Sequence, residues 1–336
     1  MNRKAIWITA AVGVAAAVGI GAFNYVEAQN RRLNMVTVVK ITGINWFNRM
    51  EEGVKQYATA SGNNATQTGP AQADAAQQLR VIQDVIARRP DAIAIVPMDP
   101  TVLEPVLKQA MDRGIKVVTH EATNQVNTLY DIEAFQNEDF GAQLNERLAQ
   151  CMGRTGKWTV FVGSLGSKTH NQWADGGIAN ARKHSGMQLV DAKQETADSA
   201  DQAYQKAREI LRKHPDIRGF QGSASTDVAG IGRAIEEAGL SNRVCVFGTS
   251  LPSIAGRFIE SGAVDGIGFW DPRDAGIVMN RVAQMAVEGR AVTDGMNLGV
   301  KGYERVRVVK GAGAGSIIYG NAAVFVDKAN LKDYPF

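Results

Sequence analysis

Short runs of apolar, mostly β-branched residues alternate along the chain with longer stretches that carry an apolar residue every three or four positions. Such runs occupy residues 35–39, 92–96, 115–119, 158–162, 244–247 and 264–269. Because they are apolar almost without a break, they predict parallel strands covered on both faces. Between them, Leu79, Ile82 and Ile86 fall on one face of a helix, and Gly114 is suited to end another. The alternation predicts right-handed crossovers and doubly wound sheets.

The predicted strands are more numerous than one open sheet usually holds, so we expect two similar α/β lobes. Polar sequence interrupts the alternation of strands and helices at residues 131–137 and again at 270–272, which predicts crossovers between the lobes. From residue 300 the chain consists of extended segments around the glycine-rich stretch 311–315, with no helical pattern between them. We expect this tail to complete sheet edges and to return to the other lobe.

The first 28 residues predict a signal peptide. A basic start at residues 2–4 precedes an apolar run over residues 5–23, and Val26 and Ala28 suit cleavage before Gln29. The alternative is an uncleaved membrane anchor, because the run is nearly long enough to span a bilayer. No second segment of this kind follows, so we expect an exported, water-soluble mature chain in the periplasm.

Composition and motifs exclude several other classes. The 336 residues are 45% hydrophobic and 21% charged, with a formal net charge of +3, which gives little support for a nucleic-acid partner. The four histidines lack metal-binding spacing, no GxSxG segment occurs, and the glycine-rich stretch lacks a phosphate-loop register. Cys151 falls on an apolar helix face and Cys245 in a strand, so both are interpreted as core residues. We expect no metal and no cofactor.

Polar and aromatic side chains gather directly after the predicted strands, where open α/β sheets bind ligands. The segments in question are 40–47, 97–100, 120–122, 165–173, 223–227, 249–250 and 270–271. Their mixture of aromatic rings and short hydrogen-bonding groups suits a polyhydroxylated ligand, because rings pack on C–H surfaces and buried polar groups pair with hydroxyls. Asp99 and Thr226 have an alternative role as helix caps.

On these segments the chain resembles the type I periplasmic binding proteins of sugar ABC transporters, the ribose-binding-protein class. The resemblance extends from residue 35 to residue 336 and rests on residues 92–97 with Asp99-Pro100, on 114–119 and on 266–271. The branch it resembles most is that of the autoinducer-2 and rhamnose-type receptors, through Lys40, Asn171-Gln172-Trp173, Phe269-Trp270-Asp271 and the ending 330–336.

The resemblance implies an α/β protein of the periplasmic binding protein-like I class. Two doubly wound parallel-sheet lobes are joined by three crossovers and close over a cleft between them. Residues 34–133 with 271–319 form the N-terminal lobe, and residues 134–270 with 320–336 form the C-terminal lobe. The crossovers near Glu133, Trp270 and Gly320 are expected to act as the hinge.

Site residues carried over from the family match only in part. Lys40 matches the ligand-contacting lysine of the autoinducer-2 receptors, and Glu121 stands where they have aspartate. Their adjacent Asp-Gln pair falls near Thr169 and His170, so both residue types are lost.

Other positions depart from the autoinducer-2 receptors and from the ribose-binding proteins. The proline and alanine contacts of the autoinducer-2 receptors align with Ala224 and Thr226. The two arginines of the ribose pocket fall at Ala122 and near Gln172, and its second-lobe aspartate is Thr249. These departures argue against ribose and favour a neutral sugar or polyol.

We therefore expect a periplasmic receptor, not an enzyme, that captures a monosaccharide or polyol-like ligand and delivers it to the permease of an ABC importer. The alternative is an autoinducer-2 receptor, or a sensory protein that presents its ligand to a chemoreceptor. An enzyme is disfavoured because no paired carboxylates accompany a nucleophile, and a LacI-type repressor because the export signal replaces its DNA-binding head. We expect a monomer that binds no nucleic acid. The expected ligand contacts are Lys40, Asn45, Trp46, Phe47, Asp99, Glu121, His170, Gln172, Trp173, Ala224, Thr226, Thr249 and Trp270.

Overall fold

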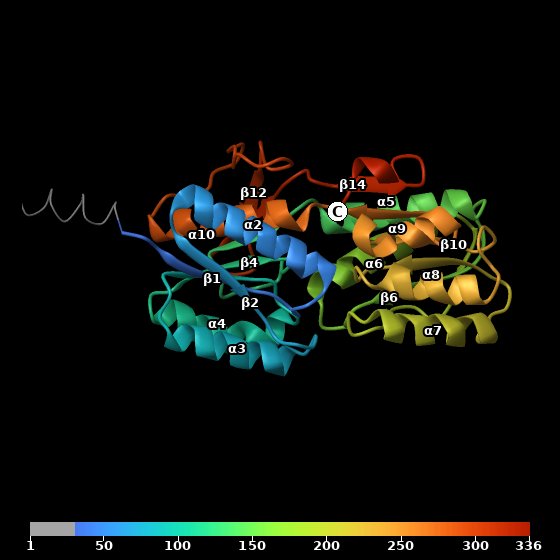
Figure 1. Cartoon of the computed structure of the whole chain (residues 1–336), viewed down its shortest axis with the longest axis horizontal. Coiled ribbons are helices and arrows are strands. Elements are labelled where there is room, and N and C mark those ends of the chain that lie inside the picture. The colour runs from blue at the N-terminus through green and yellow to red at the C-terminus, as the bar shows by residue number, and fades with distance from the viewer. Residues whose placement is uncertain (1–30) are drawn as a thin grey trace, which may run out of the picture.

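The computed structural model describes residues 31–336, so the predicted signal peptide lies outside the described part of the chain. Two lobes lie side by side along the long axis of the molecule, each built on one sheet with helices on both faces (Figure 1). Among residues 31–336, no helix combines the length and the apolar character that crossing a membrane would require.

The first lobe contains a seven-stranded sheet. Its strands are β1 (Asn34–Val38), β2 (Asn64–Thr68), β3 (Ala92–Ile95), β4 (Lys116–His120), β5 (Tyr130–Glu133), β12 (Arg307–Lys310) and β13 (Ser316–Tyr319). They lie in the order β12-β13-β5-β4-β3-β1-β2, and every neighbouring pair is parallel except β12 with β13. The helices of this lobe are α2 (Asn45–Ser61), α3 (Ala75–Ala87), α4 (Pro100–Asp112) and α10 (Pro272–Val287).

The second lobe repeats this plan. Its strands are β6 (Thr155–Val162), β7 (Gly186–Leu189), β8 (Gln194–Glu195), β9 (Ile217–Gly222), β10 (Cys245–Thr249), β11 (Gly266–Phe269) and β14 (Val324–Asp327). The order is β14-β11-β10-β9-β6-β7, with β8 also paired to β6 and β14 antiparallel to β11. The helices are α5 (Asn137–Cys151), α6 (Lys168–Ala181), α7 (Ala200–Lys213), α8 (Asp227–Glu237) and α9 (Pro252–Ser261), and a 3-10 turn, Leu331–Asp333, follows β14.

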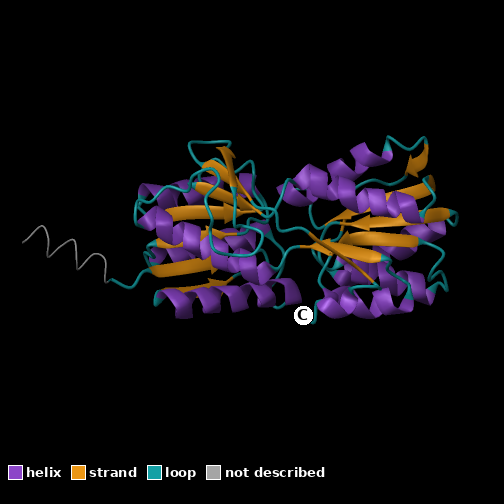
Figure 2. Cartoon of the chain, turned by 90° about the horizontal axis from the view of Figure 1, so that it is seen from above, coloured by secondary structure: helices purple, strands orange, loops and turns teal. Residues whose placement is uncertain are grey.

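The chain passes between the two sheets three times: after β5, after β11 and after β13. Figure 2 shows these connecting segments running between the lobes, with the C-terminus close to the gap. The predicted two-lobed α/β fold with three crossovers is therefore confirmed. The residue limits proposed for the two lobes stay a prediction.

The six apolar runs correspond to β1, β3, β4, β6, β10 and β11, each of which pairs with a strand on both sides. β9 pairs on both sides too but was not predicted, because Arg218, Gln221 and two glycines interrupt its apolar sequence. β2 was not anticipated because its sequence, Asn-Ala-Thr-Gln-Thr, is polar and the strand lies at a sheet edge. Residues 131–137, expected as a polar crossover, begin inside β5 instead. Asp131 and Glu133 are buried there, and Asp131 Oδ1 accepts from Thr119 Oγ1 at 2.8 Å and from the backbone N–H of Ala122 at 3.1 Å.

The interpretation of both cysteines as simple core residues is wrong. Cys151 and Cys245 form a disulfide across a sequence separation of 94 residues. Cys151 is the exposed last residue of α5, and Cys245 is the buried first residue of β10. The bond therefore fastens the end of α5 to the amino end of a central strand.

Candidate functional site

A cavity with about 300 Å³ of empty space lies between the lobes. The first lobe contributes Lys40, Ile44, Trp46, Phe47 and Glu121, the second contributes His170, Trp173, Asp198, Ser223, Ser225 and Thr249, and Trp270 comes from a crossover. All of these except Ile44 are buried. This figure includes open solvent. The space that the centre of a water-sized molecule can reach is only about 20 Å³, so a larger ligand requires the lobes or the lining side chains to move.

Strand ends and helix starts bring these side chains together. Glu121 directly follows β4, Thr249 is the last residue of β10, and Trp270 directly follows β11. Carboxyl ends of parallel strands meet at one edge of a sheet, which explains why residues distant in sequence share the cavity. On α6, His170 and Trp173 are three residues apart and therefore lie on the same helix face.

Close helix packing fixes the position of Trp173. A side-chain carbon added to Gly141 of α5 would lie 2.0 Å from the backbone oxygen of Trp173, so only glycine permits this approach of α5 to α6. The indole Nε1 of Trp173 donates a hydrogen bond of 2.8 Å to Asn137 Oδ1, at the start of α5. The ring is consequently held in place before any ligand binds.

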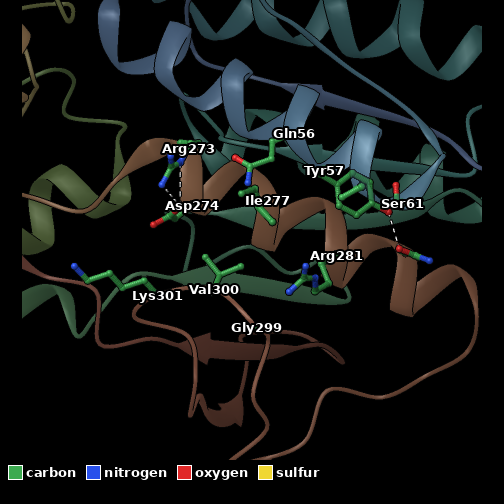
Figure 3. A pocket seen from close by; sticks show the side chains of 12 residues that line it. Gln56, Tyr57, Ser61, Arg273, Asp274, Ile277, Arg281, Gly299, Val300 and Lys301 are labelled. Atoms are coloured by element: carbon green, nitrogen blue, oxygen red, sulfur yellow. Dashed lines mark hydrogen bonds and ion pairs between the residues drawn. The ribbon is translucent and has the colours of Figure 1, made fainter. Parts of the chain in front are cut away.

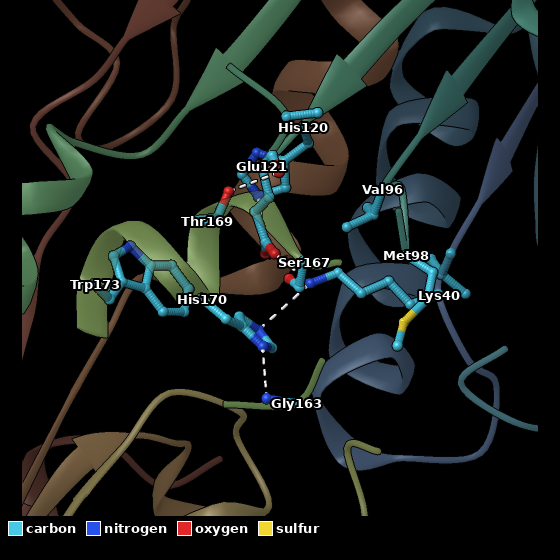
Figure 4. Close-up of polar contacts among 12 residues, drawn as sticks. Lys40, Val96, Met98, His120, Glu121, Gly163, Ser167, Thr169, His170 and Trp173 are labelled. Carbon is cyan, nitrogen blue, oxygen red and sulfur yellow. Dashed lines mark hydrogen bonds and ion pairs between the residues drawn. The ribbon is translucent and has the colours of Figure 1, made fainter. Parts of the chain in front are cut away.

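A buried ion pair forms the charged centre of the cavity. Lys40 Nζ donates to Glu121 Oε2 at 2.6 Å and lies 3.5 Å from His170 Nε2 (Figure 4). Burial opposes the charged form of Lys40, but the attraction of Glu121 and of Asp198 outweighs it, so the pKa of Lys40 is raised. Lys40 is therefore a cation that both lobes surround.

His170 is neutral and presents a donor to the cavity. Burial and the neighbouring Lys40 charge hold the pKa of His170 well below its ordinary value. The backbone N–H of Gly163 donates to His170 Nδ1 at 3.1 Å, so this hydrogen bond assigns the imidazole proton to Nε2. Because Lys40 Nζ and His170 Nε2–H are both donors, they do not bond to each other, and both can serve a ligand oxygen.

Aromatic rings form one wall of the cavity. The ring centroid of Trp270 lies 4.7 Å from that of Trp46 and 5.6 Å from that of Trp173, with edge-to-face geometry in both pairs. Phe135, in the first crossover, packs on Trp270 at 5.3 Å in the same manner. Rings locked in this way offer apolar surface of the kind that packs against C–H groups.

Several buried polar atoms that line the cavity lack a hydrogen-bond partner within the described part of the chain. They are Asp198 Oδ2, Ser223 Oγ, Thr249 Oγ1 and Trp270 Nε1. A buried polar group without a partner costs about 1–3 kcal/mol, and native proteins keep few of them. Four residues with such an atom line this one cavity, and they include both donors and acceptors, so a polar ligand there would satisfy them.

Asp227 stabilises the backbone of the segment that carries Ser223 and Ser225. Its carboxylate accepts hydrogen bonds from the backbone N–H groups of Ser223 and Ala224, at 3.0 and 2.9 Å, and from Thr196 Oγ1 at 2.7 Å. Burial raises the pKa of Asp227 from 3.8 to about 7 even though these hydrogen bonds oppose the shift. Asp227 therefore fixes the backbone that carries Ser223 and Ser225.

Replacing Asp227 with asparagine should remove a pH-dependent part of the stability. The native carboxyl binds a proton up to about pH 7, whereas an unfolded one releases it near 3.8, so the native state holds more protons in this window. As pH rises from about 4 to 7, the free energy of unfolding of wild type should therefore fall relative to that of Asp227→Asn. The expected fall is up to about 4 kcal/mol. Urea unfolding of both proteins at pH 4, 5.5 and 7 measures this, and a difference that is independent of pH would contradict it.

Of the thirteen residues expected from the sequence, eight line the cavity: Lys40, Trp46, Phe47, Glu121, His170, Trp173, Thr249 and Trp270. Five do not. Asn45 is exposed at the start of α2. Asp99 caps α4 by accepting from the backbone N–H groups of Thr101 and Val102.

The remaining three lie beside the cavity. Gln172 Oε1 accepts from Thr123 Oγ1 and from Asn137 Nδ2, both at 3.2 Å, outside the cavity lining. Ala224 and Thr226 are buried next to the lining residues Ser223 and Ser225.

Sequence reasoning missed Ile44, Asp198, Ser223 and Ser225 as lining residues. Both serines belong to the segment 223–227 that was singled out, so a shift of one residue would have found them. No sequence pattern indicated Asp198 as a site residue, because the preceding strand β8 has only two residues and no apolar run.

A larger groove lies on the first lobe between α2, α10 and residues 299–301 (Figure 3). It holds about 910 Å³, including open solvent, and is lined by Tyr57, Arg273 and Arg281 among others. Its charges are engaged locally: Arg273 pairs with Asp274 at 3.2 Å, and Arg281 donates to the backbone oxygen of Leu298. We assign the ligand site to the smaller cavity, because residues of both lobes line it and four of them have a buried polar atom without a hydrogen-bond partner within residues 31–336.

Two α/β lobes, each built on one sheet, with a polar and aromatic cavity between them are typical of the two-lobed solute-binding proteins. The chain belongs to the periplasmic binding protein family, since the family model described as "Periplasmic binding protein domain" matches residues 35–291. It is 24% identical over 225 residues to the D-ribose/D-allose-binding protein of Pseudomonas aeruginosa, which covers 63% of this chain and 68% of that protein.

Solved structures show the same fold. An ABC transporter solute-binding protein from Clostridium phytofermentas, with bound L-rhamnose, has a TM-score of 0.84 and 22% identity, covering 90% of this chain and 98% of that one. LsrB from Clostridium saccharobutylicum, in complex with AI-2, has a TM-score of 0.82 and 21% identity, covering 90% and 99%. The Pseudomonas aeruginosa relative is named as a sugar-binding protein, and the Clostridium phytofermentas structure as a solute-binding protein of an ABC transporter.

Proposed function

We propose that this chain is a periplasmic receptor that encloses one monosaccharide or polyol-like molecule between its lobes and delivers it to the permease of an ABC importer. The main supporting observation is that four residues with an unpartnered buried polar atom line the cavity, which three tryptophans also line. Hydroxyls of a polyol would complete the hydrogen bonds of Asp198, Ser223 and Thr249, and its C–H faces would pack on the indoles.

The relatives support this proposal through the ligands that their names print: ribose, allose and L-rhamnose. The receptor is proposed to act as a monomer, without catalysis and without a cofactor. Removal of residues 1–28 by a signal peptidase would place it in the periplasm. Because lining residues come from both lobes, ligand release requires the lobes to separate about the three crossovers.

A second candidate ligand is autoinducer-2, with presentation to a chemoreceptor as the corresponding role. The observation in its favour is the buried Lys40, which this chain shares with the receptors it resembles, together with the structural likeness to LsrB. Glu121 in place of their aspartate reduces the room beside Lys40 and favours the sugar.

A thermal-shift panel of D-ribose, D-allose, L-rhamnose and autoinducer-2 tests the proposal. A compound present at a hundred times its dissociation constant should stabilise the protein by about 2.7 kcal/mol and raise Tm by roughly 4 °C. Thr249→Val keeps the side-chain shape but removes a cavity hydroxyl, so it should reduce the shift. Asn45→Ala, exposed on α2, is the matched control and should leave the shift unchanged. No shift with any sugar or with autoinducer-2 would refute the proposed ligands.

A further inference from the structure

Asp198 occupies an unusual backbone position at the edge of the cavity. Both Ala197 and Asp198 have left-handed backbone conformations, with φ of 50° and 51°, between β8 and α7. Residues other than glycine adopt this region rarely and at a cost, and such outliers concentrate at functional sites. The backbone thus holds the Asp198 side chain in a direction that the local sequence does not favour.

The Asp198 carboxylate is buried and makes no hydrogen bond to any residue of the described range 31–336. It is not needed as a helix cap, because Ser199 Oγ already accepts from the backbone N–H of Gln202 at the start of α7. Burial raises the pKa of Asp198, and the nearby Lys40 opposes this. Lys40 is itself bonded to Glu121, so two carboxylates share one cation.

Gly163 leaves room for the Asp198 carboxylate, because glycine has no side chain. A side-chain carbon added to Gly163 would lie 2.7 Å from Asp198 Oδ1, so the carboxylate occupies the space that any larger residue would fill. The same Gly163 donates the hydrogen bond that orients His170. Gly163 therefore lies next to both an acceptor, Asp198, and the imidazole whose Nε2–H is a donor.

We propose that Asp198 determines specificity by accepting two hydrogen bonds from adjacent donors on the ligand, and that it excludes anionic sugars. The donors are either neighbouring hydroxyls of a neutral polyol or the protonated amine of an amino sugar, since both supply what a buried carboxylate lacks. With Lys40 matched by Glu121 and His170 neutral, Asp198 leaves the cavity with an excess negative charge. A uronate or a sugar phosphate would add a further buried negative charge. This inference rests on the proposed function, namely that a polyol occupies the cavity.

Asp198→Asn is the central variant, because asparagine keeps the shape and tolerates the left-handed conformation. Without ligand, the variant should melt about 2 °C or more above wild type at pH 8, since an uncompensated buried charge is removed. Calorimetry with the tightest-binding panel sugar should show about ten- to hundredfold weaker binding. Ser199→Ala is the matched control: it should lower Tm through loss of the helix cap but leave the affinity unchanged.

A second experiment identifies which donor groups of the ligand Asp198 accepts from. Wild type and Asp198→Asn are titrated with that panel sugar, with its amino-deoxy analogue and with its uronate analogue. Preference for the amino analogue that disappears in Asp198→Asn assigns an ammonium group, and preference for the neutral sugar that weakens in Asp198→Asn assigns hydroxyls.

Two results would overturn the role of Asp198: unchanged sugar affinity in Asp198→Asn, or uronate binding as tight as that of the neutral sugar. A lower Tm of ligand-free Asp198→Asn would do the same, because it would assign Asp198 to folding. If no sugar shifts the melting of wild type, the proposed function itself fails, and this outcome is distinct from the three results above.

Discussion

Lys40→Met should destabilise the protein by about 3–5 kcal/mol and abolish tight ligand binding. The side chain of Lys40 is 4% exposed and that of Glu121 is 3% exposed, so the variant leaves a buried carboxylate without its cation. Removing one partner of a buried ion pair is much more costly than removing both, because the remaining charge is neither hydrated nor paired. Asp198 also loses the attraction of Lys40, which adds to the effect.

A double-mutant cycle separates the pair from its surroundings. Glu121→Gln alone should also destabilise, whereas Lys40→Met combined with Glu121→Gln should recover a large part of the loss. Lys55 is the matched control, since it forms an ion pair of 2.9 Å with Glu51 but has a side chain 68% exposed. Lys55→Met should change stability by less than about 1 kcal/mol. Urea unfolding at pH 7 measures all four variants, and a loss below about 1 kcal/mol for Lys40→Met would contradict a buried pair.

Most of the central strands could be predicted because their apolar runs reflect burial on both faces. β9 is the exception in the second sheet, because Arg218 and Gln221 interrupt its apolar sequence. β2 and β7 lie at or near sheet edges, pair on one side and need no continuous apolar sequence, so no run marked them. β5 was not predicted either, because its Asp131 and Glu133 are polar although both are buried. Burial of polar residues depends on tertiary partners, which hydrophobic periodicity does not report.

Most of the site could be predicted because ligand residues of open α/β sheets follow the strands. Lys40, Glu121, Thr249 and Trp270 were found in this way. Asp198 could not be, because its position depends on two left-handed residues and on the absence of a side chain at Gly163. These conditions arise between β8 and α7 and have no periodic signature in the sequence.

The disulfide could not be predicted from the sequence, because 94 residues separate its cysteines. Only the assembled lobe brings the end of α5 against the first residue of β10. The same geometry places the bond away from the ligand. Thr249 lies at the other end of β10, four residues and therefore about 13 Å from Cys245.

Replacing both cysteines with alanine should destabilise the protein by roughly 2–5 kcal/mol with little effect on ligand affinity. A closed loop of about a hundred residues corresponds to about 4.7 kcal/mol in the chain-entropy account, and measured values are usually lower. Thermal melts with and without a reductant measure the effect: reduction should lower Tm of wild type but not that of the double variant. Equal melting of wild type in both buffers would show that the bond does not constrain the fold. Because the bond and the cavity lie at opposite ends of β10, a loss of affinity equal to that of Lys40→Met would instead show that the two ends are coupled.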